Sequence, residues 1–416
     1  MNRSSTVLGF LIVQLIACSE SGDQAPTFAV RDTVGVKIVE NFAPAWPENH
    51  AWRLEVEPLL DLSGADDDEL FRTWNARLLP DGRVALFNGG NCEVRFYDQA
   101  GGLLAKMGRC GEGPGEFGQF AGIWPWRGDS VLVVEQGRRL TFLGSDGSLG
   151  RTVRFPTSSD IPLGSVRGVL ADGTLVLAGL RDPIGRDTPG MEVAQFSLGL
   201  LRDPRASPIS VGLYPGPVYE YAEFAGNLTR GPLAFSGSTE FAAGNSRFFV
   251  GLPDRFEIRV HTPDGGLERI IRRVFEPVAV TRRDIDWLMD RRLGQVEGQE
   301  NQAAVRQAFR NLRHAEVMPA FGRPVWPGGA EGGPTMLADD TGNLWIFVHY
   351  RPGEYRNDWS VFSPDGVWLG TVNLPERLTP SQIGADFLLG RSTDETGFTH
   401  IQLYRLLKHD ASPAAP

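Results

Sequence analysis

Short apolar runs that alternate with Asp-Gly turns recur along most of this chain, and no other feature restricts its fold as strongly. Residues 78–117 show the unit most clearly, with apolar runs at 84–87, 94–96 and 103–107 between turn sequences. Glycine accepts a positive φ, and an Asp-Gly pair between apolar runs is a strong signal for a β-hairpin. The unit is therefore a meander of short antiparallel strands.

The same unit returns four more times, at 123–155, 168–213, 246–275 and 335–374. Three of these copies carry an explicit turn of the same kind, namely Asp146-Gly147, Asp264-Gly265 and Asp365-Gly366. Units of about four short strands at this spacing are typical of the blades of a β-propeller. A chain of 416 residues, with 50 Gly and 29 Pro, is also too long for one ordinary core unless the core is divided among repeats.

A shorter stretch at 387–408 remains after the fifth unit. We expect two N-terminal strands, at 36–39 and 52–56, to pair with it and complete a sixth blade. Such pairing would close the ring and remove exposed sheet edges. The sequence therefore predicts an all-β fold, a six-bladed β-propeller over residues 30–410.

One segment, 281–317, has helical rather than strand periodicity. Thr281 is a predicted helix cap with Asp284 in the first turn, and apolar residues then repeat at helical spacing in two stripes, from 285 to 293 and from 304 to 312. This helical insertion precedes the fifth blade. Two interpretations stay open: the helices pack on the outside or on one rim of the propeller, or they cap its central funnel.

The N-terminus is a targeting segment. Arg3 precedes an apolar run at 7–17, which ends in Leu15-Ile16-Ala17-Cys18 and resembles the bacterial lipobox. In that motif the cysteine becomes the acylated, palmitate-bearing first residue after cleavage. The alternative is an ordinary secretory signal that happens to contain a cysteine.

The lipobox interpretation sets the expected organisation and location of the chain. Residues 1–18 are then a lipoprotein signal peptide with Cys18 as lipid anchor, 19–29 a polar tether, and 411–416 a disordered tail. The expected location is the cell envelope, with the protein lipid-anchored in the outer membrane and facing the periplasm or the cell surface. The formal net charge of −10, without a basic stripe, argues against nucleic acid as a partner.

Two further cysteines, Cys92 and Cys110, lie on either side of the hairpin turn near Ala100. Register counting places Cys92 opposite about Gly108, so Cys110 falls within disulfide reach. An exported protein is located in an oxidising compartment, which favours a disulfide between these two cysteines. The alternative is a pair of buried free thiols. Zinc is not expected, because the chain has no CxxC motif or suitably spaced histidines.

The decapeptide at 108–117, GRCGEGPGEF, together with the blades around it, resembles a loop that follows the first blade in bacterial six-bladed β-propeller lipoproteins of the NHL-repeat-like type. The segment 340–345 and the helical insertion extend this resemblance over most of residues 30–408. It implies architecture, because most members of that family have no assigned activity. Within the loop, Arg109 is expected to pair with Glu112 or Glu116 and fix the loop, with contact to a ligand as the alternative.

The sequence offers little chemistry beyond this loop. It has no nucleophile elbow and no HExxH motif, and we assign no catalytic, metal or cofactor residues. His261 and His349 lie on predicted strands from which they could point into the funnel, although an ordinary strand role is the simpler interpretation. The acidic run at 66–69 lacks the ligand spacing of a calcium loop, so a solvated loop is favoured.

These observations favour a membrane-anchored, extracytoplasmic and non-catalytic propeller that binds or scaffolds an unknown peptide, glycan or protein partner. The alternative is a metal-dependent enzyme resembling propeller lactonases or sugar dehydrogenases, which use funnel carboxylates. That alternative needs Asp, Glu, Asn or His at inner-strand positions of several blades, and no such repeated set is visible.

Overall fold

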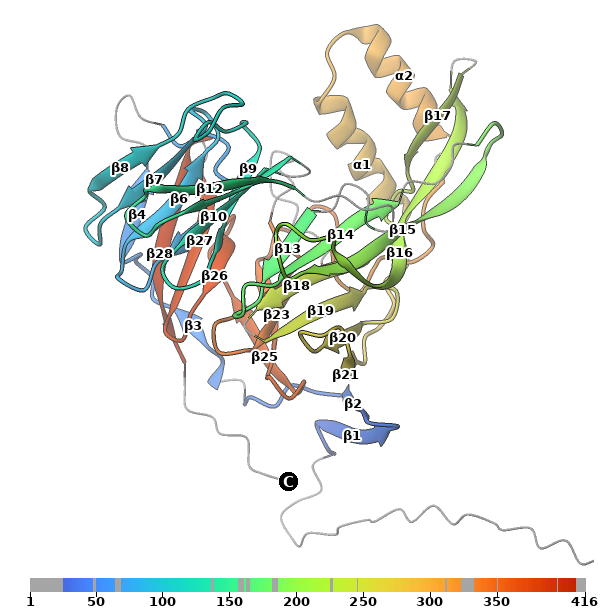
Figure 1. Ribbon diagram of the computed structural model, residues 1–416. Coiled ribbons are helices and arrows are strands. Elements are labelled where there is room, and N and C mark those ends of the chain that lie inside the picture. The colour runs from blue at the N-terminus through green and yellow to red at the C-terminus, as the bar shows by residue number, and fades with distance from the viewer. Residues whose placement is uncertain are drawn as a thin grey trace, which may run out of the picture.

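The computed structural model describes an all-β chain with two helices (Figure 1). It covers residues 25–408 except for 48–49, 64–68, 136–137, 156–160, 162–164, 182–185, 225–226, 245, 311–312, 323–332, 350 and 395. Cys18, the signal peptide, most of the tether, residues 66–68 of the acidic run and the tail at 411–416 lie outside the described residues. No helix among the described residues is long and apolar enough to cross a membrane.

The strands form six sheets. The first sheet holds β5 (Ala76–Leu78), β6 (Val84–Asn88), β7 (Glu93–Tyr97) and β8 (Leu103–Met107). The second holds β9 (Ala121–Pro125), β10 (Val131–Glu135), β11 (Arg139–Leu143) and β12 (Leu149–Arg154). The third holds β13 (Ser165–Val169), β14 (Leu175–Arg181), β15 (Gly190–Leu201), β16 (Ile209–Phe224) and β17 (Asn227–Pro232).

Two of the remaining three sheets, the fourth and the sixth, include strands from the N-terminal region. The fourth holds β18 (Glu240–Gly244), β19 (Arg247–Leu252), β20 (Glu257–His261) and β21 (Leu267–Arg273), extended by β2 (Val36–Asn41) and β1 (Phe28–Thr33). The fifth holds β22 (Met336–Ala338), β23 (Leu344–Phe347), β24 (Asp358–Phe362) and β25 (Trp368–Asn373). The sixth holds β26 (Thr379–Ile383), β27 (Phe387–Thr393) and β28 (Thr399–Leu407), which pairs with β3 (Arg53–Leu54) and β4 (Leu60–Ser63).

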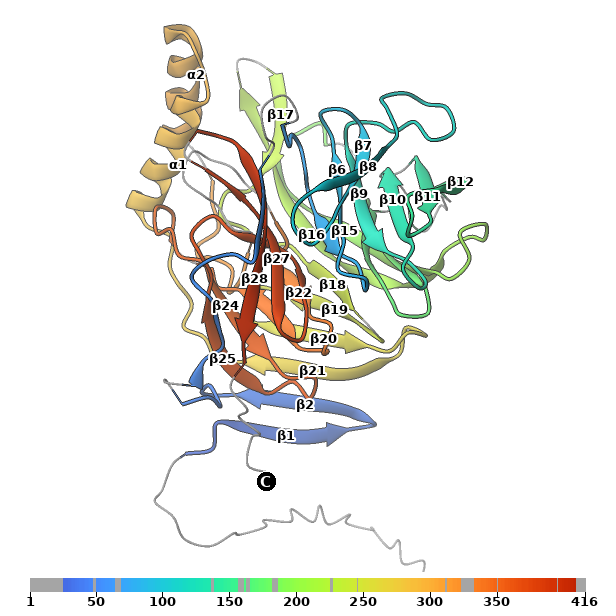
Figure 2. The same ribbon diagram turned by 90° about the vertical axis from the view of Figure 1, so that its left-hand side faces the viewer.

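The N-terminal strands divide between two sheets. The pairing expected for 52–56 is confirmed, because β3 and then β4 run antiparallel to β28. The pairing expected for 36–39 is wrong, because β2 instead runs parallel to β21 in the fourth sheet, between β21 and the edge strand β1 (Figure 2). The buried side chain of Asn41 fixes this position: its Nδ2 donates to the carbonyl oxygens of Arg272 and Gly366, and its Oδ1 accepts from the Trp368 backbone N–H.

Six hydrophobic clusters show how the sheets are arranged. Five of these clusters each join two sheets that are consecutive in the chain. The first and second sheets, for example, share Phe87, Phe96, Ile123 and Val133. The last cluster joins the sixth sheet to the first, through Leu389 and Ile401 on one side and Ala76 and Leu86 on the other. The sheets therefore surround a common centre, which is the arrangement of a β-propeller-like fold.

The helical insertion lies between the fourth and fifth sheets, as expected, and comprises α1 (Arg282–Gly294) and α2 (Gln299–Arg310). The Asp284 carboxylate accepts hydrogen bonds from the backbone N–H and the hydroxyl of Thr281, which confirms the expected cap. A short antiparallel neck closes the base of the insertion, with Ala279 opposite Val317. Both views show the helices projecting beyond the sheets (Figures 1 and 2).

The periodicity of the two helices predicts that one apolar face of each is buried, but no described apolar residue of either face is fully buried. The only buried residue of α1 is Asp284, which pairs with Arg351 at 2.8 Å, and the described side chains of α2 are at least partly exposed. Arg313, just after α2, instead pairs with Glu220 of β16 at 3.4 Å. Ion pairs therefore connect both helical segments to loops and strands of the sheets.

Candidate functional site

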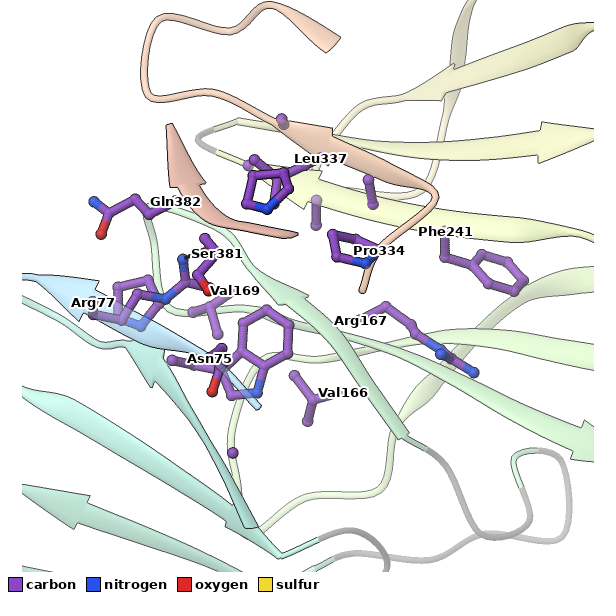
Figure 3. A pocket seen from close by; sticks show the side chains of 18 of the residues that line it. Asn75, Arg77, Val166, Arg167, Val169, Phe241, Pro334, Leu337, Ser381 and Gln382 are labelled. Atoms are coloured by element: carbon purple, nitrogen blue, oxygen red, sulfur yellow. Dashed lines mark hydrogen bonds between the residues drawn. The ribbon is translucent and has the colours of Figure 1, made fainter. Parts of the chain in front are cut away.

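A cavity of about 730 Å³ lies at the common centre of the six sheets. Each sheet contributes the strand at one of its edges to the lining: β5, β9, β13, β18, β22 and β26. Figure 3 shows side chains from these strands around the cavity, including Arg77, Arg167, Phe241 and Gln382. Six segments spread over more than 300 residues thus meet at one site.

The two-residue period of a strand decides which side chains face this cavity. On β5, the buried Ala76 packs between the first and sixth sheets, whereas Arg77 lines the cavity. On β9, the buried Ile123 packs into the core, and its neighbours Gly122 and Trp124 are part-exposed beside the cavity. On these two strands, neighbouring residues therefore divide between the core and the cavity.

Arg77 is the cation most firmly embedded in this lining. Its Nη1 donates to the carbonyl oxygen of Ser381 on β26, and its guanidinium lies 5.5 Å from the ring centre of Trp124. Its Nε is buried without a hydrogen-bond partner among the described residues. Burial lowers the pKa of Arg77 to about 10, although the charge of Asp340 opposes the shift, so the side chain stays protonated at neutral pH.

Asp340 supplies a carboxylate to the same part of the lining. Its Oδ2 accepts a hydrogen bond from Nε2 of Gln382 at 3.3 Å. Burial raises the pKa of Asp340, against the lowering effects of that hydrogen bond and of the Arg77 charge. The neighbouring Asp339 also borders the cavity, but its oxygens accept from Asn343 and from Nε1 of Trp345, which assigns it to the turn before β23.

Charges of opposite sign balance one another around the described lining. The charged residues among those lining it are three arginines and three carboxylates: Arg77, Arg127, Arg167, Glu240, Asp339 and Asp340. Aromatic side chains separate them: Trp74, Phe120, Trp124, Trp126 and Phe241. The cavity therefore presents aromatic surfaces together with both hydrogen-bond donors and acceptors, without a net charge on these six groups.

The loop at 108–117 lies apart from the cavity. Arg109 pairs with Glu116 at 2.7 Å, which is one of the two expected pairs, and Glu112 instead pairs with Arg138 at 3.2 Å. None of Arg109, Glu112 and Glu116 is among the residues that line the cavity. The Cys92–Cys110 disulfide is present at the start of this loop, with Cα atoms 4.8 Å apart. These contacts place the loop in the connection between the first two sheets.

The two histidines expected on strands do not reach the cavity lining. His261 lies on β20, the third strand of its sheet in chain order from β18, where its ring stacks on Phe248 and Nε2 lies 3.2 Å from the Tyr214 hydroxyl. Burial lowers the pKa of His261, and burial lowers that of His349 to about 4. The idea that they point into the funnel is wrong, because neither is among the residues that line the cavity, and His349 lies after the end of β23 rather than on a strand.

Sequence reasoning missed Arg77, Trp124, Arg167 and Asp340, although a signal for some of them was present. Arg77 and Arg167 each stand in an apolar run just before an Asp-Gly turn, Asp81-Gly82 and Asp172-Gly173. The two arginines differ by one position relative to that turn. A register shift between Val166 and Gly168 in β13 accounts for the difference, since a bulge adds one residue to a strand.

Comparisons with known proteins give structural neighbours but no family. No family model matches the sequence, and no curated protein matches it. A Bacteroides fragilis protein assigned as exported is 12% identical with a TM-score of 0.43, over 90% of this chain and 100% of that chain. A gluconolactonase of Xanthomonas campestris is 15% identical with a TM-score of 0.38, over 85% and 97% of the two chains.

A third neighbour is virginiamycin B lyase of Staphylococcus aureus, in a catalytically inactive form with quinupristin. It is 9% identical with a TM-score of 0.36, over 85% of this chain and 99% of that chain. At these identities and TM-scores the likeness assigns no activity to this chain.

Proposed function

We propose that this chain is an extracytoplasmic, lipid-anchored, six-bladed β-propeller that binds a partner in its central channel without catalysing a reaction. In this proposal each of the six sheets is one blade, and the sixth is closed by β3 and β4 from the N-terminal region. The partner is a glycan, a peptide or a segment of a protein that enters the channel. Cys18 anchors the domain to the outer membrane through the tether.

One observation carries the binding role: an edge strand from each of the six sheets lines a single cavity of about 730 Å³. Its volume lies within the roughly 300–1,000 Å³ typical of small-ligand pockets, and its mixture of aromatic and polar groups is typical of such pockets as well. Among the described residues, no three His, Cys, Asp or Glu side chains gather in a way that could hold a metal ion. The alternative, a metal-dependent lactonase or sugar dehydrogenase, is tested by metal analysis of the purified protein.

Blocking the channel tests the binding role. Gly122 lines the cavity, and a Cβ added there would lie 3.5 Å from Oδ1 of Asn75, which is ordinary contact. Gly122→Leu should therefore place a bulky side chain in the cavity and obstruct ligand binding while the fold persists. A thermal-shift screen of glycans and peptides should reveal ligands that raise the Tm of the wild type and not that of Gly122→Leu.

Two results would contradict the binding role. One is a ligand that stabilises the wild type and Gly122→Leu equally, because its site would then lie outside the channel. The other is stoichiometric Ca²⁺ or Zn²⁺ in the purified protein together with turnover of a lactone or sugar, which would favour the enzyme.

The anchor is tested separately in the native host. Stable anchoring needs more than one acyl chain, which a triacylated cysteine provides. Cys18→Ala should move the protein from the membrane fraction to the soluble fraction. Retention of the variant in the membrane fraction would contradict the proposal that Cys18 carries the lipid anchor, and would leave the proposed binding role unaffected.

A further inference from the structure

We infer that the channel recognises a neutral oligosaccharide, whose sugar rings stack on an aromatic rim at the edge of the cavity. This inference rests on the proposed binding function and names its ligand class. The aromatic rim consists of Phe71, Trp74 and Phe120. All three lie in the segments that lead into β5 and β9, the first strands of the first and second sheets.

The rim exposes large aromatic side chains that the fold does not use for its own core. Their exposed fractions are 54% for Phe71, 49% for Trp74 and 64% for Phe120. Trp74 and Phe120 also line the cavity, so the rim is continuous with it. Exposed apolar surface next to a cavity is typical of ligand recognition, since isolated exposed side chains are common but clustered ones are not.

Arg72 joins two of the three rings of the rim, Phe71 and Phe120. Its guanidinium lies 5.1 Å from the ring centre of Phe71 and 4.9 Å from that of Phe120. It also donates from Nη1 to Oε1 of Gln119, next to Phe120. A cation held against two rings restrains both, so less rotamer entropy remains to be lost when a ligand binds.

The backbone beneath the rim is fixed as well. The buried Asn88 accepts the backbone N–H of Phe71 at Oδ1, 2.9 Å away, and Gly90 donates to the Phe71 carbonyl oxygen at 3.1 Å. Arg72 itself has a φ of 53°, in the left-handed region that a residue with a side chain rarely occupies. Strain of this kind persists only where surrounding contacts maintain it, and it is concentrated at ligand sites.

Trp74 is supported from the sixth sheet. The guanidinium of Arg391 on β27 lies 5.9 Å from the Trp74 ring centre, and its Nη1 donates to the Thr73 carbonyl oxygen at 3.3 Å. On the other side, Asn75 exchanges two hydrogen bonds with the backbone of Ile123 on β9, at 2.7 and 3.0 Å. The first, second and sixth sheets thus position this side chain together.

The polar part of the lining favours a neutral polyhydroxylated ligand. A sugar ring presents an apolar C–H face, which packs on an aromatic ring, and hydroxyl groups that both donate and accept. The lining includes groups of both kinds: Arg77 as a donor and Asp340 as an acceptor, which already accepts from Nε2 of Gln382. Because its arginines and carboxylates balance, the lining gives no net attraction to a charged peptide.

The test uses neutral oligosaccharides as probes. Gluco-, manno- and galacto-oligosaccharides and N-acetylglucosamine oligomers of about three to six sugars are titrated calorimetrically into the full soluble domain. We expect at least one series to bind. Trp74→Ala and Phe120→Ala should each bind it about tenfold more weakly, which corresponds to about 1.4 kcal/mol for a lost stacking partner.

Two further variants separate stacking from folding. Trp74→Phe keeps an aromatic ring and should recover most of the affinity. Phe398→Ala is the matched control, because Phe398 is 46% exposed and does not line the cavity. It should bind like the wild type. Circular dichroism and Tm verify that each variant is folded.

The outcomes distinguish this inference from the proposed function. Binding of peptides, and of no neutral oligosaccharide, with loss of that binding in Gly122→Leu, would overturn the oligosaccharide inference and leave the channel function standing. Oligosaccharide binding of equal affinity in the wild type and Trp74→Ala would contradict stacking of the sugar on the aromatic rim. Absence of binding by either class would contradict both.

Discussion

Arg139 on β11 binds the carboxylate of Glu135 on β10 with two hydrogen bonds, from Nε at 2.8 Å and from Nη2 at 3.0 Å. The same guanidinium donates to the carbonyl oxygens of four residues in the loop at 108–117: Gly111, Glu112, Gly113 and Glu116. Glu135 in turn accepts the backbone N–H of Gly118 at 2.9 Å. The pair therefore fastens the connection between the first two sheets to the second sheet.

Removing the guanidinium should destabilise the fold strongly. Arg139→Ala leaves the buried Glu135 charge and the loop carbonyls without this partner, and breaking a buried pair on one side typically costs about 3–5 kcal/mol. Urea unfolding measures the change. Arg138→Ala is the control, because its pair with Glu112 is exposed on both sides, and a change within about 0.5 kcal/mol is expected. Equal effects of the two variants would contradict the role assigned to Arg139.

The disulfide should stabilise the same region. Cys92 and Cys110 are 18 residues apart, and closing a loop of that length contributes about 3 kcal/mol by the chain-entropy model. We expect Cys92→Ser with Cys110→Ser to lose about that amount in urea unfolding. Peptide mapping without reduction should recover the linked pair. Two thiols that alkylate in the native protein would show that the bond is absent.

Titration of His400 should make the stability of the pairing between β28 and β4 depend on pH. Its Nδ1 lies 2.9 Å from Oδ1 of Asp61, which joins β28 to β4. Burial lowers the pKa of His400, but the hydrogen bonds and charges of Asp61 and Asp394 outweigh it, so the net shift is upward. A raised folded-state pKa means that the pair contributes fully below the unfolded value of about 6.5, and that the contribution is lost as pH rises through the folded-state pKa.

The size of this effect is modest, because both side chains are partly exposed. We expect the free energy of unfolding of the wild type, relative to that of His400→Gln, to fall by no more than about 1 kcal/mol between about pH 6 and pH 9. Urea unfolding at several pH values measures the difference. A difference that is constant or rises with pH would contradict the assignment.

Deleting the helical insertion should leave the sheets and the channel intact. No residue of α1 or α2 is among those that line the cavity, and their apolar stripes do not join the cores between the sheets. Ala279 and Val317 are paired across the neck, so removing 284–314 and inserting a short Gly/Ser link joins neighbouring ends. We expect a cooperatively folded protein with unchanged affinity for any ligand of the channel. Loss of affinity in a folded variant would favour the helices as a cap.

Local features of this protein were accessible from the sequence. Asp-Gly turns fix hairpins between neighbouring strands, so the five repeated units and most of their strands were predicted. Cys92 and Cys110 are neighbours across one such hairpin, and Thr281 and Asp284 are three residues apart at a helix start. Each of these depends on interactions within about twenty residues, where the covalent chain already limits the possible partners.

Tertiary structure alone decided the partners that are distant along the chain. The alternation in 36–41 predicts a strand, but nothing local distinguishes β28 from β21 as its neighbour, and the buried Asn41 reaches atoms more than 200 residues away. The hydrogen bond from Arg77 to the Ser381 carbonyl oxygen likewise joins residues that are 304 positions apart in the sequence. The channel lining and its aromatic rim exist only once six cores have packed and the ring has closed, because burial and proximity at the centre are properties of the whole ring.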